Sequence, residues 1–105
     1  MEQIRQGDVL LVAVERRTPS GVERQTRTIL AEGEMTGHAH TLTAPAVYDW
    51  VENGQRYVRV SGGPGILYHE EHDPVPAPVV PADVTYQVIP QQEWNLEDQW
   101  QKVQD

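Results

Sequence analysis

Glycine and proline are spread so closely along this chain that few stretches are long enough for a helix. The 105 residues include eight of each, and both residue types interrupt regular secondary structure. Between them lie short runs rich in Val, Ile, Thr and aromatic residues, which are typical of β-strands. The pattern predicts a mainly β protein, a small antiparallel β-barrel or sandwich of about six to eight strands.

The strongest strand signal surrounds Asn53-Gly54. This dipeptide accepts the positive φ angles of a two-residue type I′ turn, and β-branched and aromatic residues flank it on both sides over 47–60. Such a turn pairs Glu52 with Gln55 and thereby sets the register of the strands on either side. The sequence therefore predicts an antiparallel hairpin over 47–60.

In that register, one face of the hairpin is aromatic. Trp50 stands opposite Tyr57 and Tyr48 stands opposite Arg59, and aromatic cross-strand pairs each stabilise a sheet by roughly 0.2–1 kcal/mol. Two interpretations of this face stay open. Tyr48, Trp50 and Tyr57 either pack in the interior, which is the commoner arrangement, or form a binding surface.

The whole chain, 1–105, is interpreted as a single β domain. Four prolines within 73–81 forbid a central strand there and favour an extended edge segment. Over 95–103, Asn95 can cap a helix, and the apolar residues that follow share one helical face, which favours a short C-terminal helix. Further strands are expected over 9–14, with both faces covered, over 22–30, over 66–69 and over 84–89.

Composition excludes several classes of protein. No cysteine is present, which rules out disulfides, thiolate nucleophiles and cysteine-ligated metal sites. The formal net charge of −8 disfavours binding to nucleic acid or to an anionic membrane. The apolar run over 9–14 is too short for a signal peptide or a membrane span. We therefore expect a cytoplasmic protein that binds a small molecule or a protein partner, a second copy of itself included.

All four histidines lie in two short motifs, His-Ala-His and His-Glu-Glu-His. Residues two apart in an extended strand project from the same face, so the first motif can present two imidazoles to one ion. The second motif offers at least one imidazole and one carboxylate. Neutral imidazole together with a carboxylate suits a divalent transition metal such as zinc, iron, nickel or manganese. The candidate metal ligands are His38, His40, His69, His72, Glu71 and Glu34.

Two functions of different classes follow. The first is a β domain that binds a transition metal through both histidine motifs. Its chemistry is unassigned, and whether it is an enzyme stays open, because the chain has no cysteine, no Gly-x-Ser-x-Gly elbow and no phosphate-binding loop. The second is a non-enzymatic interaction or structural protein, such as a bacterial or phage assembly component. In that case the same loops dock a partner and the histidines belong to a solvated surface.

Four segments of the chain together resemble a family of small uncharacterised bacterial and phage proteins. The motifs that carry the resemblance most specifically are Glu-Gly-Glu-x-Thr-Gly-His-Ala-His and His-Glu-Glu-His. The resemblance covers most of the chain and implies no particular activity. The four segments are 5–11, 30–40, 67–72 and 86–94.

A looser likeness is to the cupins, in which a His-x-His on one strand joins a downstream carboxylate and a later histidine on a second strand. The His-Ala-His motif matches the first pair, and His69 is similar to the later histidine. Ala44 stands where the cupin carboxylate is expected, so Glu34 or Glu71 would have to replace it. The likeness concerns the geometry of a site and implies no function.

Overall fold

The computed structural model describes residues 3–7, 9–32, 39–69 and 77–90. Within these ranges the regular structure is all strand, and no helix occurs that is long and apolar enough to cross a membrane. The helix expected over 95–103 lies outside the described residues. The strands are β1 (Gln3–Gln6), β2 (Val9–Val14), β3 (Gln25–Glu32), β4 (Ala39–Glu52), β5 (Gln55–Ser61), β6 (Gly65–His69), β7 (Val79–Val80) and β8 (Thr85–Pro90).

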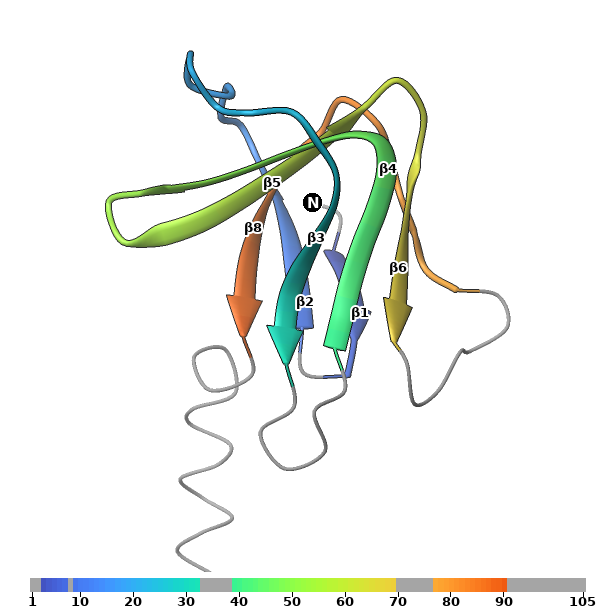
Figure 1. Ribbon diagram of the computed structural model, residues 1–105. Helices are drawn as coiled ribbons and strands as arrows, with labels where there is room; N and C mark the ends of the chain where they lie inside the picture. The colour runs from blue at the N-terminus through green and yellow to red at the C-terminus, as the bar shows by residue number, and fades with distance from the viewer. Residues whose placement is uncertain (1–2, 8, 33–38, 70–76, 91–105) are drawn as a thin grey trace, which may run out of the picture.

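The strands form one antiparallel sheet that curls into a nearly closed barrel (Figure 1). Hydrogen-bonded neighbours follow the order β1-β2-β8-β5-β4-β6-β7, and β3 pairs with β4 in addition. The mainly β fold predicted from the spacing of glycine and proline is confirmed, and the barrel is the form that the sheet takes. The long strand β4 is central to it because three strands pair with β4.

The hairpin around Asn53-Gly54 is confirmed in its predicted register. Asn53 has φ 53° and Gly54 has φ 76°, the positive values that a type I′ turn requires. The turn pairs Glu52 with Gln55, and the ladder continues with Trp50 opposite Tyr57. Local turn chemistry therefore determines how β4 and β5 meet.

The hairpin extends well beyond 47–60, because β6 continues along the same edge of β4 where β5 leaves it. Between Thr43 and Ala46 of β4 lie two residues, whereas four separate their partners Ile66 and Ser61. The surplus residues belong to the loop between β5 and β6, where residues 62 and 63 are bends. Figure 1 shows the bend as a projecting arm, made by β5 and the end of β4, that leads down into the barrel wall.

Glycines at 62 and 63 allow this bend. Gly62 has φ 81° and Gly63 has φ 151°, values that side chains rarely permit. A Cβ on Gly62 would lie 3.2 Å from the Cβ of Pro45, so the glycines also let the loop sit closely on Pro45. Proline occurs in sheets at bulges or edges because it lacks an N–H donor, and Pro45 lies where β4 changes partners.

The barrel interior is filled by alternate residues of the strands, with Leu42, Leu67, Val58 and Tyr86 among those completely buried. The expectation that both faces of 9–14 are covered was wrong for β2. Val9 and Leu11 are buried, whereas the other four residues of the strand are only half-buried. One face of β2 looks into the barrel and the other lies on its outer surface, so only the first reaches the core.

Two strands were not predicted. β1 is a short polar strand that pairs with β2, and its sequence has none of the β-branched or aromatic enrichment that marks strands. The two-residue β7 lies at the end of the sheet beside β6, within the described part of the proline-rich segment. The strand expected over 22–30 is displaced to β3.

Candidate functional site

His40 and His69 lie side by side on neighbouring strands of the barrel wall. His40 lies near the start of β4 and His69 ends β6, and the two residues are directly paired in the antiparallel ladder. Their ring centroids are 4.3 Å apart and the ring planes are inclined by 35°. The pairing of β4 with β6 therefore brings together one histidine from each of the two motifs.

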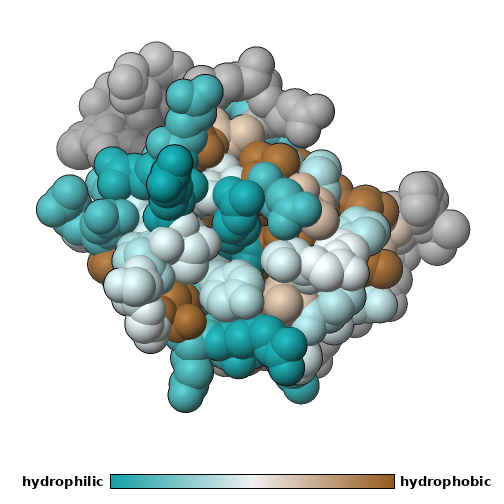
Figure 2. All heavy atoms as spheres, turned by 90° about the horizontal axis from the view of Figure 1, so that it is seen from above, coloured by the Kyte–Doolittle hydropathy of each residue, from teal (hydrophilic) through white to brown (hydrophobic). Residues whose placement is uncertain are grey.

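The pair points into the barrel. Two residues further along the ladder, Leu42 pairs with Leu67, and both are completely buried. Since residues two apart share a face of a strand, the histidines form the next inward-facing row, where β4 begins and β6 ends. His40 is 4% exposed and His69 is half-buried. The opposite end of the barrel, seen from above in Figure 2, is mostly hydrophilic with small hydrophobic areas between.

A buried glutamine from β1 contacts His40. The Nε2 of Gln6 donates a hydrogen bond of 2.9 Å to the backbone oxygen of Leu67, and the Oε1 lies 2.8 Å from Nδ1 of His40. Gln6 is 7% exposed, and buried polar groups are normally held by such partners. The glutamine links β1 to β6 and to His40 at once, although β1 forms no backbone ladder with either strand.

Gly7 lies beside Cε1 and Nε2 of the His40 ring. A Cβ built on Gly7 would stand 3.2 Å from Cε1 and 3.6 Å from Nε2 of His40. Gly7 also has φ 52°, a left-handed conformation that costs non-glycine residues energy. Both space and backbone conformation therefore favour glycine at this position.

Among the described residues, no group of three or more His, Asp or Glu side chains lies close enough to hold a metal ion. His40 and His69 are the two predicted ligands that the described part of the chain brings together. The remaining four predicted ligands lie outside the described residues: His38, His72, Glu71 and Glu34.

The aromatic face of the hairpin packs within the protein. Trp50 and Tyr57 stack with centroids 5.8 Å apart and are 7% and 3% exposed, and Tyr48 is half-buried. The Arg16 guanidinium lies 4.8 Å from the centre of the Tyr57 ring and its Nη1 is 3.3 Å from Glu52. The indole and phenol rings are thus largely covered, and their observed contacts are packing contacts.

Sequence reasoning missed a charged cluster inside the arm. Arg56 donates from Nε to Oδ1 of Asp49 at 3.0 Å and from Nη2 to Oδ2 at 2.6 Å, and the Thr28 hydroxyl donates to the same Oδ2 at 2.6 Å. Burial raises the pKa of Asp49. The hydrogen bonds from Arg56 and Thr28 and the positive charge of Arg56 lower it by more, so the pKa lies below its ordinary value. The predicted hairpin register already made Asp49 and Arg56 diagonal neighbours on one face.

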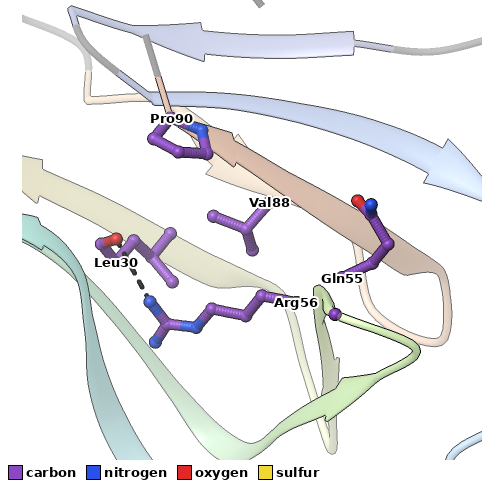
Figure 3. A pocket seen from close by; sticks show the side chains of 6 residues that line it. Leu30, Gln55, Arg56, Val88 and Pro90 are labelled. Carbon is purple, nitrogen blue, oxygen red and sulfur yellow. Dashed lines mark hydrogen bonds between the residues drawn. The ribbon is translucent and has the colours of Figure 1, made fainter. Parts of the chain in front are cut away.

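Arg56 also joins β5 to β3, which form no ladder with each other. It donates to the backbone oxygens of Ile29 at 2.8 Å and of Leu30 at 3.2 Å. Beside this contact lies a cavity of about 190 Å³, and Figure 3 shows the Arg56 side chain reaching across it towards Leu30. Neither His40 nor His69, the two predicted metal ligands in the described part of the chain, lines the cavity. Its lining residues are Leu30, Gly54, Gln55, Arg56, Val88 and Pro90.

Comparison with known proteins connects this architecture to one family. No curated protein and no solved structure matches the chain. A family model described as "Domain of unknown function (DUF8820)" matches residues 5–89, well over half of the 105. The match spans the strands from within β1 to within β8 and includes Gln6, His40 and His69. The chain therefore belongs to this family of domains of unknown function.

Proposed function

We propose that this domain binds a divalent transition metal ion through His40 and His69, with the chemistry at the ion unassigned. The observation that carries the proposal is the direct pairing of the two imidazoles on the inward face of the barrel. Imidazole is the commonest protein ligand for such metals. Two histidines held on neighbouring strands lose little freedom when they bind one ion, because the ladder already orients them.

The separation of the rings suits a shared ion. A metal about 2.0–2.1 Å from a ring nitrogen lies about 3.2 Å from the ring centre, so ligands at right angles have centroids about 4.5 Å apart. The observed separation is 4.3 Å. A tetrahedral ion needs about 5.2 Å, so the rings would move apart by about 1 Å to accept zinc. The arrangement favours ions that take ligands at right angles, such as nickel, iron or manganese.

Further ligands would come from the two motifs themselves. His38 precedes His40 by two positions and Glu71 follows His69 by two, and both residue types bind these metals. Glu34 and His72 extend the set. We propose that one or two of these four complete the coordination of the ion.

Metal-dependent stabilisation tests the proposal. The melting temperature of protein purified without a histidine tag is measured with zinc, nickel, iron(II) and manganese in turn. An ion that binds only the folded state, at a free concentration a hundredfold above its dissociation constant, should stabilise the protein by about 2.7 kcal/mol. The variant His69→Gln should lose this increase in melting temperature.

The matched control is Thr41→Ala. Thr41 neighbours His40 on β4 and pairs with Tyr68 rather than with His69, so it lies on the other face of the same strand. Its variant should keep the full metal response. If every metal leaves the melting temperature of the unaltered protein unchanged, the metal-binding function is rejected.

A second candidate, docking of another copy of this chain, is favoured by the outer face of the same strands. Ile29, Ile66, Tyr68 and Val79 are between 37% and 55% exposed. The ladder places Ile29 and Tyr68 on either side of Thr41, and Ile66 pairs with Val79. Contiguous exposed apolar patches of this kind mark interaction sites.

Self-association fits this face because it holds few charges. Among the described strands, the charged residue in the same rows of the ladder as these apolar residues is Arg27. Two copies could therefore meet through this face without bringing the acidic groups behind the net charge of −8 together. Light scattering should then report a dimer that Tyr68→Lys converts to a monomer. A monomer at all concentrations for the unaltered protein would reject this candidate.

A further inference from the structure

We propose that Gln6 is a positioning residue that holds His40 in the tautomer with the proton on Nδ1, so that the ring lone pair lies on Nε2, the atom that would ligate a metal. The effect of this tautomer on metal binding rests on the proposed function, whereas the tautomer itself can be measured without any metal. It is carried by the two hydrogen-bond contacts of the buried Gln6 side chain and by the position of Gly7.

The direction of the hydrogen bonds follows from the backbone. The Leu67 oxygen can only accept, so the group of Gln6 that lies 2.9 Å from it must be the amide NH₂. The amide oxygen is then the atom that faces Nδ1 of His40 at 2.8 Å. An oxygen cannot donate, so Nδ1 carries the proton and donates it.

In a neutral imidazole only one nitrogen is protonated, so a proton on Nδ1 leaves the lone pair on Nε2. Metal-binding histidines commonly donate their other ring N–H to a carbonyl or carboxylate, which fixes the ring and its tautomer. The contact between Gln6 and His40 has this form. Because Gln6 is anchored to the backbone of β6, it ties the His40 imidazole to the strand that carries His69.

Gly7 limits the bulk beside the ligand atom. A side chain at Gly7 would begin 3.6 Å from Nε2 and 3.2 Å from Cε1, where it would crowd an ion about 2.0–2.1 Å from Nε2. The adjacent residues Gln6 and Gly7 therefore lie beside different atoms of one ring, Gln6 at Nδ1 and Gly7 at Cε1 and Nε2. Gln6 determines which nitrogen carries the lone pair, and Gly7 adds no side chain of its own beside that nitrogen.

The first test is a nitrogen-15 NMR spectrum of the metal-free protein in mildly alkaline buffer. Protonated and lone-pair-bearing ring nitrogens have well-separated resonances, so the tautomer of His40 is read directly. We expect the unaltered protein to show His40 protonated at Nδ1. In the variant Gln6→Met, which is similar in length but cannot accept this hydrogen bond, the resonances should move towards a mixture of both tautomers.

The second test compares metal affinities of the same variants, with the metal that stabilises the unaltered protein most. Loss of a ligand-orienting partner typically lowers affinity 10–100-fold, and we expect Gln6→Met to fall in that range. Gln6→Glu keeps an acceptor for Nδ1 and should retain the tautomer. It also serves as the deciding variant if Gln6→Met fails to fold.

Thr85→Val is the matched control for loss of a buried side-chain hydrogen bond. Thr85 is 1% exposed, and its hydroxyl accepts from Arg59 at 3.0 Å and donates to the Arg16 oxygen at 2.7 Å. It pairs with Val14 at the end of β2 far from Val9, the partner of Gln6. Its variant should lose stability while the His40 tautomer and the metal affinity stay unchanged.

The outcomes separate the two proposals. A proton on Nε2 of His40 in the unaltered protein, or a Gln6→Met variant with unchanged tautomer, would overturn the role of Gln6. The expected tautomer in a protein that none of the four metals stabilises would support that role and reject the metal-binding function. A metal affinity that falls equally in Gln6→Met and Thr85→Val would show general destabilisation and would also overturn the positioning role.

Discussion

Replacing Leu67 with Ala is expected to lower the free energy of unfolding by about 2–5 kcal/mol, the range for removing a fully buried leucine side chain. Leu67 is completely buried and pairs with the equally buried Leu42. The truncation leaves a cavity that the surrounding strands can only partly fill. Urea denaturation followed by tryptophan fluorescence measures the change, with an unchanged slope showing that the unfolded state is the same.

The neighbouring residue provides the control. Ile66 is 37% exposed on the outer face of β6, so Ile66→Ala should cost much less, about 1 kcal/mol or below. The comparison has a direct bearing on the site, because His69 shares the inward face with Leu67. Equal losses for both variants would contradict the placement of β6 and remove His69 from the barrel interior.

The second large effect concerns Arg56. The variant Arg56→Met keeps most of the side-chain length but leaves the carboxylate of Asp49, whose side chain is 15% exposed, without its cationic partner. Removing one member of a buried ion pair costs about 3–5 kcal/mol. Because the Arg56 side chain is 30% exposed, solvent screens the pair, and we expect about 3 kcal/mol, at the lower end of that range.

This loss should depend on pH. The folded protein holds the pKa of Asp49 below its ordinary value, so the stabilisation is fully present above about pH 3.9, the pKa of an unfolded aspartate, and disappears as the pH falls through the lower folded value. The difference in unfolding free energy between the unaltered protein and Arg56→Met should therefore be largest near neutral pH and shrink in acid. Denaturation curves recorded across this range measure it.

Arg59→Met is the matched control for this experiment. Arg59 lies on the same strand, and its described hydrogen bond is to the Thr85 hydroxyl rather than to a carboxylate. A hydrogen bond of this kind contributes about 0.5–1.5 kcal/mol. The difference in unfolding free energy between the unaltered protein and Arg59→Met should therefore not shrink in acid. An Arg56→Met variant that loses no more stability than Arg59→Met would show that the Asp49 pair contributes little.

Some features of the histidine pair could be predicted from the sequence, and others could not. Concentration of all four histidines in two motifs is visible in the sequence, and it singled out His40 and His69 among the candidate ligands; the structure pairs these two residues. The part played by Gln6 was not visible, because a lone glutamine in a short polar strand carries no pattern. It becomes significant only when β1 is placed against β6 and its amide meets both the Leu67 oxygen and His40.

Local residues by themselves determined the β class and the register of the hairpin. Asn53-Gly54 acts through the φ angles of two residues, and pairing then follows rung by rung to Trp50 and Tyr57. The same register makes Asp49 and Arg56 diagonal neighbours on one face of the hairpin. These features depend on contacts between residues close together in the chain, which sequence patterns describe well.

Only the tertiary structure decided that His40 meets His69. The two surplus residues between Ser61 and Ile66 shift the ladder, and no local rule states that β6 should return to β4 after the glycine loop rather than pair elsewhere. That choice is made by burial, since pairing β6 with β4 sets Leu67 beside Leu42 in the closed barrel. Free energy from apolar surface removed from water depends on the whole enclosure, and it is this enclosure that places the two imidazoles in one row.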